Sequence, residues 1–236
     1  MDITLSDFKY IAENLADVRA RLAAAAQRAG RPTPTLIAVT KSATDDEVRA
    51  LLTFGVDAIA ENRPQMFTAR AALCDEVGAT GEIHLIGNLQ TNKVKYVVGR
   101  AAMIQSLDSI RLADEIERIA ARREVCVPVL IEVNSGREEA KGGLLPEEVP
   151  AFAEALAAYP HLLVRGLMTM GPDCEDPEDY RPYFRLVREL AEELSAKGLL
   201  PHSPALSMGM SGSYEVATEE GATHVRVGRT LFAKKD

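Results

Sequence analysis

Residues 204–227, PALSMGMSGSYEVATEEGATHVRV, contain two short apolar runs, 204–208 and 223–227, on either side of a polar stretch at 212–220. The polar stretch has the length and composition of a short helix. Neither apolar run shows the strict alternation of a strand with one wet face, and such runs are typical of parallel strands buried on both faces. The segment therefore predicts a strand–helix–strand unit.

The same alternation runs through the chain before this segment. Earlier apolar runs lie at 35–40, 57–60, 82–86, 102–105, 127–133 and 162–168. Helical stretches lie between them, at 44–54, 63–77, 91–98, 108–123, 146–159 and 177–197. Alternating strands and helices indicate a parallel sheet covered by helices, and eight such units favour an α/β fold closed as a (β/α)₈ TIM barrel. The alternative is an open doubly wound sheet, which needs a glycine-rich turn where the chain has TKSATDD at 40–46.

An extra helix is expected over 5–29, before the first strand. Its apolar residues recur at helical spacing, and they are Leu5, Phe8, Ile11, Leu15, Val18 and Leu22. Gly30 and Pro32 then mark its end. The chain has 236 residues, close to the roughly 250 of a typical barrel. Because no linker or low-complexity tract interrupts it, we expect residues 1–236 to form one domain.

Composition excludes several classes of partner. The net charge of −8 repels nucleic acid and anionic membranes. Cys74, Cys126 and Cys174 are scattered without metal-ligand spacing, as is typical of reduced thiols in a cytoplasmic protein. The N-terminus carries acids where a signal peptide carries bases, and no apolar run approaches about 18 residues. We expect a cytoplasmic protein without a metal, and a monomer because no exposed apolar stripe stands out.

Lys41 is the first candidate for chemistry. It follows the apolar run LIAVT, and active sites of this fold lie at the C-terminal ends of the strands. A lysine in a desolvated position loses its charge easily and can form a Schiff base. The alternative is a lysine whose ammonium group simply reaches water, and position alone slightly favours it.

The loops after the seventh and eighth strands predict a phosphate site. Ser207, Gly209 and Gly212 precede a short helix, and Gly228 follows the last strand. These loops are the usual anion site of the fold, although glycines that only make tight turns are the alternative. Arg226 adds a fixed cation that can meet a ring nitrogen or a phosphate. A Schiff-base lysine and a phosphate site in one mouth predict pyridoxal 5′-phosphate (PLP) or a phosphorylated carbonyl substrate.

Several strings in the chain resemble the pyridoxal phosphate homeostasis protein family, whose members are similar to the barrel domains of bacterial alanine racemase and eukaryotic ornithine decarboxylase. The resemblance runs from about residue 8 to 232. The strings are LIAVTK (36–41), AEN (60–62), IHLIGNLQTNK (83–93), VLIEVNSGREEAKGG (129–143), VRGLMTMGP (164–172) and LSMGMSGSYEVATEEGATHVRVGRTLF (206–232).

The resemblance implies a cofactor and the residues that bind it. Lys41 would form a Schiff base with PLP, and Asn62 would lie near the ring. Ser207 and the backbone around Gly228 and Arg229 would hold the phosphate.

The resemblance also implies a role for Arg226, which matches an arginine that faces the pyridine nitrogen. Such an arginine keeps the nitrogen unprotonated and weakens the ring as an electron sink. The chain departs from the family pattern at Asn88, where His is common, at Ala60, where Gly is common, and at Arg229, where Thr is common. These departures affect ligand details at the mouth.

Carrier function is expected over catalysis. Enzymes of the racemase-like class complete their site with a second domain and a dimer partner, whereas here only AKKD follows Leu231 and Phe232. An open cofactor face weakens electrostatic catalysis and allows PLP to be released. We therefore expect a PLP carrier of vitamin B6 homeostasis that lacks catalytic residues and serves apo PLP-dependent enzymes. A weak PLP-dependent racemase or lyase and a cofactor-free Schiff-base aldolase are the alternatives.

Overall fold

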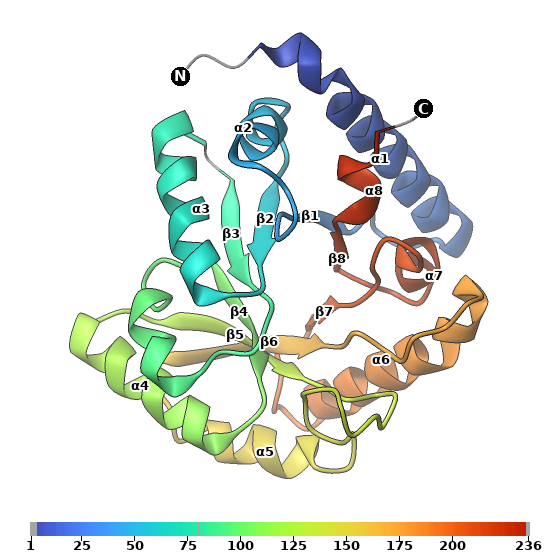
Figure 1. Cartoon of the computed structure of the whole chain (residues 1–236). Helices are drawn as coiled ribbons and strands as arrows, with labels where there is room; N and C mark the ends of the chain where they lie inside the picture. The colour runs from blue at the N-terminus through green and yellow to red at the C-terminus, as the bar shows by residue number, and fades with distance from the viewer. Residues whose placement is uncertain (1–3, 80, 235–236) are drawn as a thin grey trace.

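Eight parallel strands form a closed barrel in which consecutive strands pair and β1 (Thr35–Val39) pairs with β8 (His224–Val227). Figure 1 shows the strands at the centre of the molecule. The other strands are β2 (Ala58–Glu61), β3 (Glu82–Leu85), β4 (Met103–Leu107), β5 (Val127–Glu132), β6 (Leu162–Met168) and β7 (Ala205–Ser207). This computed structural model describes residues 4–79 and 81–234, so residues 1–3, 80, 235 and 236 of the expected domain lie outside the described residues. The predicted barrel is confirmed.

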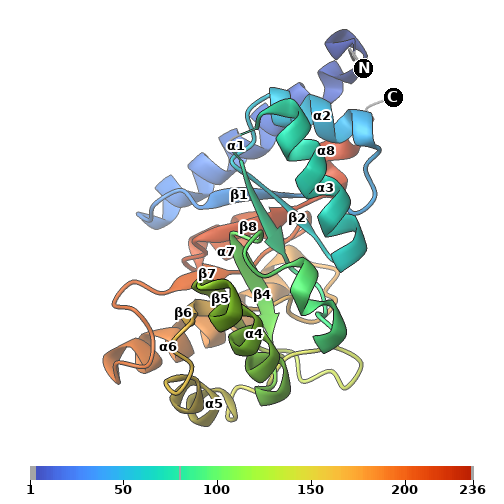
Figure 2. The same ribbon diagram turned by 90° about the vertical axis from the view of Figure 1, so that its left-hand side faces the viewer.

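Helices follow the strands and cover the outside of the barrel (Figures 1 and 2). They are α2 (Asp45–Thr53), α3 (Pro64–Val77), α4 (Ile110–Arg123), α5 (Val149–Leu156), α6 (Arg181–Ala196) and α7 (Tyr214–Glu219), with the 3₁₀ turn η3 (Pro177–Tyr180) before α6. The expected N-terminal helix is present as a 3₁₀ turn, η1 (Leu5–Phe8), followed by α1 (Lys9–Ala29). α1 packs along α7 and along α8 (Arg229–Phe232), a short helix that the sequence analysis did not anticipate.

One expected helix has a different form. The stretch 91–98 contains a 3₁₀ helix, η2 (Thr91–Tyr96), in place of an α-helix. Val94 is its only buried side chain. Val97 and Val98, just beyond the turn, are also buried against the core, and 3₁₀ helices of this kind occur in short pieces.

Side chains inside the barrel differ in character from those outside it. Alternate residues of each strand point inward and outward. The outward residues join the aliphatic layer beneath the helices, whereas Ile37, Ala58 and Ala60 form a separate small cluster in the interior. Arg226 is paired in register with Ile37, so it also points inward. Polar side chains therefore occupy part of the barrel interior.

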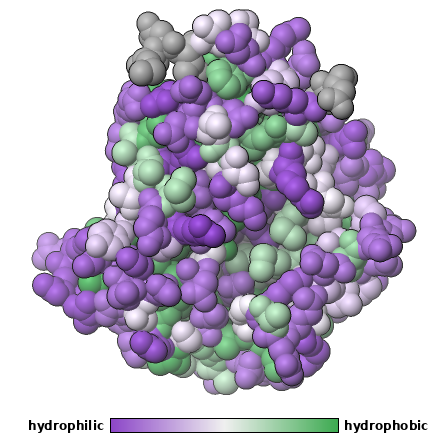
Figure 3. Space-filling view, in the orientation of Figure 1, coloured by the Kyte–Doolittle hydropathy of each residue, from purple (hydrophilic) through white to green (hydrophobic). Residues whose placement is uncertain are grey.

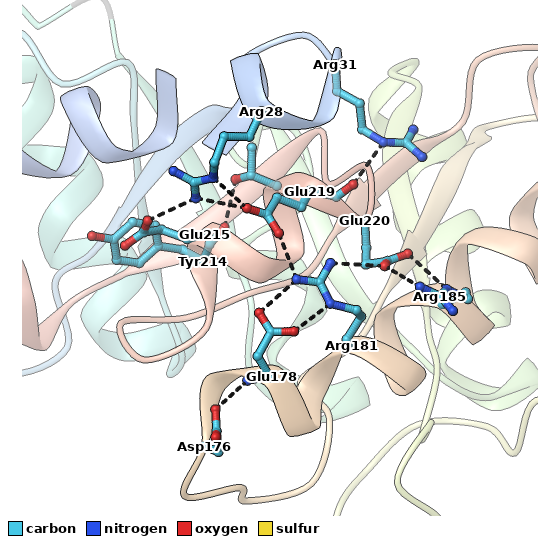
Figure 4. A network of polar contacts seen from close by, with 11 residues as sticks. Arg28, Arg31, Asp176, Glu178, Arg181, Arg185, Tyr214, Glu215, Glu219 and Glu220 are labelled. Carbon is cyan, nitrogen blue, oxygen red and sulfur yellow. Dashed lines mark hydrogen bonds and ion pairs between the residues drawn. The ribbon is translucent and has the colours of Figure 1, made fainter. Parts of the chain in front are cut away.

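Ion pairs tie α7 to its neighbours, as Figure 4 shows. Arg181 of α6 lies 2.7 Å from Glu219 and 3.2 Å from Glu220. Arg28 of α1 also reaches Glu219, at 2.9 Å, and Arg185 reaches Glu220 at 2.9 Å. α7 follows the loop after β7, so this network fixes that loop against two other helices.

Replacing Arg181 with alanine should lower the free energy of unfolding, because Glu219 and the nearly buried Glu220 lose a shared donor. The expected loss is about 1–3 kcal/mol, between the values for exposed and buried pairs, and urea denaturation measures it. Arg118→Ala is the matched control, since the one ion pair that Arg118 makes with a described residue joins it to Glu115 on its own helix. Equal losses in the two variants would contradict this role of the network.

Candidate functional site

A cavity of about 990 Å³ opens at the C-terminal ends of the strands. Its lining includes Lys41, Asn62, Arg226, Gly228 and Arg229, which are five of the six residues that the sequence analysis selected as binding residues. These residues come from the ends of β1, β2 and β8 and from the start of α8. The structure therefore brings together residues that are up to about two hundred positions apart in the sequence.

The loop that carries Lys41 is held by a buried polar cluster. Thr40 is buried and donates a hydrogen bond from Oγ1 to Glu61 Oε1 at 2.6 Å. Arg70 of α3 is buried with Glu61, and it donates to the carbonyl oxygen of Ala43 at 2.6 Å. These contacts tie the segment after β1 to the end of β2, while the Lys41 side chain stays exposed. The amine can therefore reach a ligand from a rigid base.

The loops after β7 and β8 face the same cavity and touch each other. The backbone N–H of Gly228 donates to Ser211 Oγ at 3.3 Å. Gly209 has φ +89°, and a Cβ there would lie 2.4 Å from the Ala217 side chain, so only glycine lets the loop pack on α7. A Cβ on Gly212 would instead meet nothing within 4 Å. The loop thus exposes small residues and backbone to the cavity.

Ser207 is the selected residue that does not line the cavity. It is fully buried, with 0% exposure. Its Oγ accepts a hydrogen bond from Arg226 Nη1 at 2.7 Å and donates to Gln105 Oε1 at 2.7 Å. As the last residue of β7 it points into the barrel interior beneath the cavity, where it contacts Arg226 and Gln105, and its contact with a ligand stays a prediction. Ser211 and Ser213, which do line the cavity, were missed, although the string MSGS displays them.

Arg226 is held at the floor of the cavity from two sides. It is 3% exposed. Nη1 donates to Ser207, and Nη2 donates to the carbonyl oxygen of Thr169 at 2.8 Å. Burial lowers the pKa of Arg226 to about 10, and the nearby Glu132 opposes that shift. The guanidinium therefore stays charged at neutral pH while part of it faces the cavity.

Glu132 is a buried acidic residue of the cavity wall, and the sequence analysis missed it. It is the last residue of β5, 8% exposed, and it lines the cavity. Burial raises its pKa to about 7, Asp108 adds to this shift, and Arg226 opposes it. Its place inside the apolar run VLIEV concealed it, because the inward direction of one residue in a run becomes clear only from the strand register.

Glu132→Gln should change the pH dependence of stability. A carboxyl group whose folded-state pKa is raised, here from 4.5 to about 7, stabilises the protein at low pH and loses that effect as pH rises through this window. At about 1.4 kcal/mol per pKa unit, the variant should gain up to about 3 kcal/mol over the wild type between pH 4.5 and 7.5. Urea denaturation of the ligand-free protein across pH measures the difference. Glu139→Gln, on an exposed loop, is the control, and a pH-independent difference for Glu132→Gln would contradict the assignment.

Residues 14–236 match the family model of the alanine racemase N-terminal domain. The chain is also 44% identical over 227 residues to the pyridoxal phosphate homeostasis protein of Aquifex aeolicus. This match covers 94% of the chain and 97% of that relative. The chain belongs to the pyridoxal phosphate homeostasis protein family.

A solved protein of similar structure is PipY of Synechococcus elongatus with PLP bound. It has a TM-score of 0.82 and 31% identity to the chain, and the match covers 94% of this chain and 100% of PipY. The alanine racemase of Corynebacterium glutamicum shares the fold, with a TM-score of 0.73, 20% identity, and coverage of 97% of this chain and 62% of the racemase.

The three residues at which the sequence analysis expected departures from the family pattern fall at two kinds of position. Asn88 and Arg229 line the cavity, whereas Ala60 is buried in the interior of the barrel. Among the described residues, no group of three or more His, Cys, Asp or Glu side chains is placed to hold a metal ion. No helix in the described part of the chain is long and apolar enough to cross a membrane.

Proposed function

We propose that this chain binds PLP through a Schiff base on Lys41 and carries the cofactor without catalysing its usual reactions. The observation that supports this most directly is the meeting of three groups in one cavity. They are an exposed lysine amine, two loops of small residues, and a buried arginine. An amine can bind the aldehyde of PLP, the loops suit its phosphate, and a fixed cation suits its ring nitrogen.

The cavity fits PLP in size and in chemistry. Its volume of about 990 Å³ lies at the upper end of the range of small-molecule sites. Ser211, Gly212 and Gly228 border the same region as the side chain of Arg229, and hydroxyl groups, backbone N–H groups and guanidinium are the usual donors to phosphate. We assign the phosphate to these residues, with Ser207 acting through Arg226. Asn62, which lines the same cavity, would lie beside the ring.

The charge of Arg226 supports a carrier role. Bound PLP supplies an electron-withdrawing ring, and a protonated ring nitrogen strengthens that effect. Arg226 remains cationic and has only donors to offer, so it favours an unprotonated nitrogen as hydrogen-bond acceptor. Lys41 is exposed, which leaves the bound cofactor open to exchange with amines. Apo PLP-dependent enzymes are the recipients that this chemistry suggests.

A weak PLP-dependent racemase or lyase is the second candidate function, and Glu132 favours it. Its pKa of about 7 suits a group that gains and loses a proton at neutral pH, and it lines the same cavity. The two functions differ in turnover. We expect holo-protein incubated with each L- and D-amino acid to show no racemisation, decarboxylation or deamination near the common enzyme range of roughly 1–10³ s⁻¹. Turnover in that range would overturn the carrier proposal.

We further propose that residues 1–236 act as one PLP-binding domain, as a monomer in the cytoplasm. Cys74, Cys126 and Cys174 are all free thiols, which suits a reducing compartment. Hydrophobic side chains lie scattered among hydrophilic ones on the face that Figure 3 shows, which suits a monomer. The net charge of −8 disfavours nucleic acid and anionic membranes as partners.

Lys41→Ala should abolish the visible Schiff-base band that forms when PLP is added, and it should leave the far-ultraviolet circular dichroism unchanged, because the side chain is exposed and serves no packing role. Borohydride reduction and peptide mapping of the wild type should place the pyridoxyl adduct on Lys41. Lys93→Ala, in a neighbouring hollow of the mouth, is the control and should keep the band. An adduct mainly on Lys93, Lys95 or Lys141 would refute the assignment.

Ser211→Ala should weaken PLP binding by about 1–3 kcal/mol, the range for a lost hydrogen bond to a charged group. Pyridoxal, which lacks the phosphate, serves as the matched ligand and should bind the variant and the wild type equally. Titration of the visible band measures both affinities. If pyridoxal binds the wild type as tightly as PLP does, the phosphate assignment fails.

A further inference from the structure

A line of hydrogen bonds crosses the barrel interior from Arg226 to the opposite face. Arg226 Nη1 donates to Ser207 Oγ, and Ser207 Oγ donates to Gln105 Oε1, each at 2.7 Å. Gln105 Nε2 lies 2.9 Å from His84 Nδ1. His84 Nε2 lies 3.0 Å from Glu82 Oε2. Glu82 begins β3, with a side chain 64% exposed, so the line links the floor of the cavity to solvent at the other end of the barrel.

Every hydrogen bond in this line has the same direction. Arg226 can only donate, so Ser207 Oγ accepts from it and donates its own O–H to Gln105 Oε1. The carbonyl of Gln105 is then occupied, and its amide N–H₂ donates to His84. His84 Nδ1 must therefore be the unprotonated nitrogen, and Nε2–H donates to Glu82. Burial lowers the pKa of His84, in agreement with a neutral ring.

The alignment matters because Arg226 is buried and has no carboxylate hydrogen-bonded to it among the described residues. A buried guanidinium needs compensation, and here the negative ends of the Ser207, Gln105 and His84 dipoles all point toward it. Aligned hydrogen bonds polarise one another in a low-dielectric interior. A carboxylate paired directly with Arg226 would occupy its donors, whereas this line uses Nη1 alone and Thr169 uses Nη2.

Other charged groups leave the line intact. His224 on β8 lies 6.3 Å from His84, ring centre to ring centre, and burial lowers its pKa to about 4, so it is neutral at pH 7. Glu132 acts on Arg226 from β5, and no hydrogen bond joins its carboxylate to the described residues of the line. The hydrogen bonds themselves, and not these neighbouring charges, therefore orient the side chains of the line.

We propose that Ser207, Gln105 and His84 are positioning residues that hold the Arg226 guanidinium toward the ring nitrogen of the bound cofactor and connect it to Glu82 at the opposite face of the barrel. This rests on the proposed function, because it takes PLP as the ligand. A purely structural role would stabilise the barrel without affecting how the ring nitrogen is recognised. That difference decides the test.

The test compares affinities for PLP and for an analogue whose ring nitrogen is replaced by carbon. Both keep the aldehyde and the phosphate, so the ratio of their dissociation constants isolates the contact of Arg226 with the ring. We expect the wild type to favour PLP on the order of tenfold, as for one hydrogen bond to a charged group. Gln105→Met, which keeps the size of the side chain but removes both hydrogen bonds, should bring the ratio close to one.

Two further variants separate positioning from stability. Ser195→Ala removes a hydrogen bond to the carbonyl oxygen of Pro201 outside the barrel and should leave the ratio unchanged. Ser207→Ala should resemble Gln105→Met, and Ser207→Thr, which keeps the hydroxyl, should restore the ratio. A wild-type ratio of one, or a ratio that survives in Gln105→Met, would overturn the proposal. Thermal unfolding of each variant shows that it is folded at the assay temperature.

Nitrogen-15 NMR of the ligand-free wild type tests the hydrogen-bonded line without any cofactor. His84 should appear as the neutral tautomer with the proton on Nε2, and this state should be lost or exchange rapidly in Gln105→Met. A His84 proton on Nδ1 would overturn the line itself. If the wild type shows this tautomer but binds no PLP, the proposed function fails while the hydrogen-bonded line stands, so the two failures are distinguishable.

Discussion

The buried guanidinium of Arg226 is the constraint on which the rest of this site depends. A cation taken out of water is costly unless hydrogen bonds replace its hydration. Here Ser207 Oγ and the carbonyl oxygen of Thr169 accept hydrogen bonds from the guanidinium on the side away from the cavity. The nearby Glu132 carboxylate also favours the charged form of Arg226. The pairing of β8 with β1 then sets this charge beside the strand that leads to Lys41. Barrel closure therefore brings the amine and the cation into one cavity.

The loops around the cavity are rigid for reasons that lie outside it. The buried pair of Arg70 and Glu61 holds the segment on both sides of Lys41. The ion pairs between α1, α6 and α7 hold the loop after β7. Neither group contacts the cavity directly. A site built this way is already formed before a ligand arrives, which reduces the entropy cost of binding. With an exposed Lys41, it suits binding and release better than a reaction that needs water to be excluded.

Ser207 and Ser211 show why a candidate site is harder to predict than a fold. Both serines lie in the string SMGMS, and both are near the end of β7. Ser207 is still within the strand, so its direction follows strand alternation and it points inward to Arg226. Ser211 lies in the loop, where Gly209 turns the backbone at φ +89°, and it lines the cavity. Local sequence does not show where the strand ends. The end of the strand decides which of the two serines points inward to Arg226 and which one lines the cavity.

The sequence by itself determined the alternation of eight strands and their helices, the extra helix before β1, and the position of Lys41 after the first strand. These depend on the spacing of apolar residues along short segments, which is a local property. Only the tertiary structure decided which polar residues face inward and which of them meet. Glu132, Gln105 and His84 come from three strands, and their inward direction and contacts depend on register between segments distant in the chain. Such contacts leave no periodic trace in the sequence, because each involves one residue per strand.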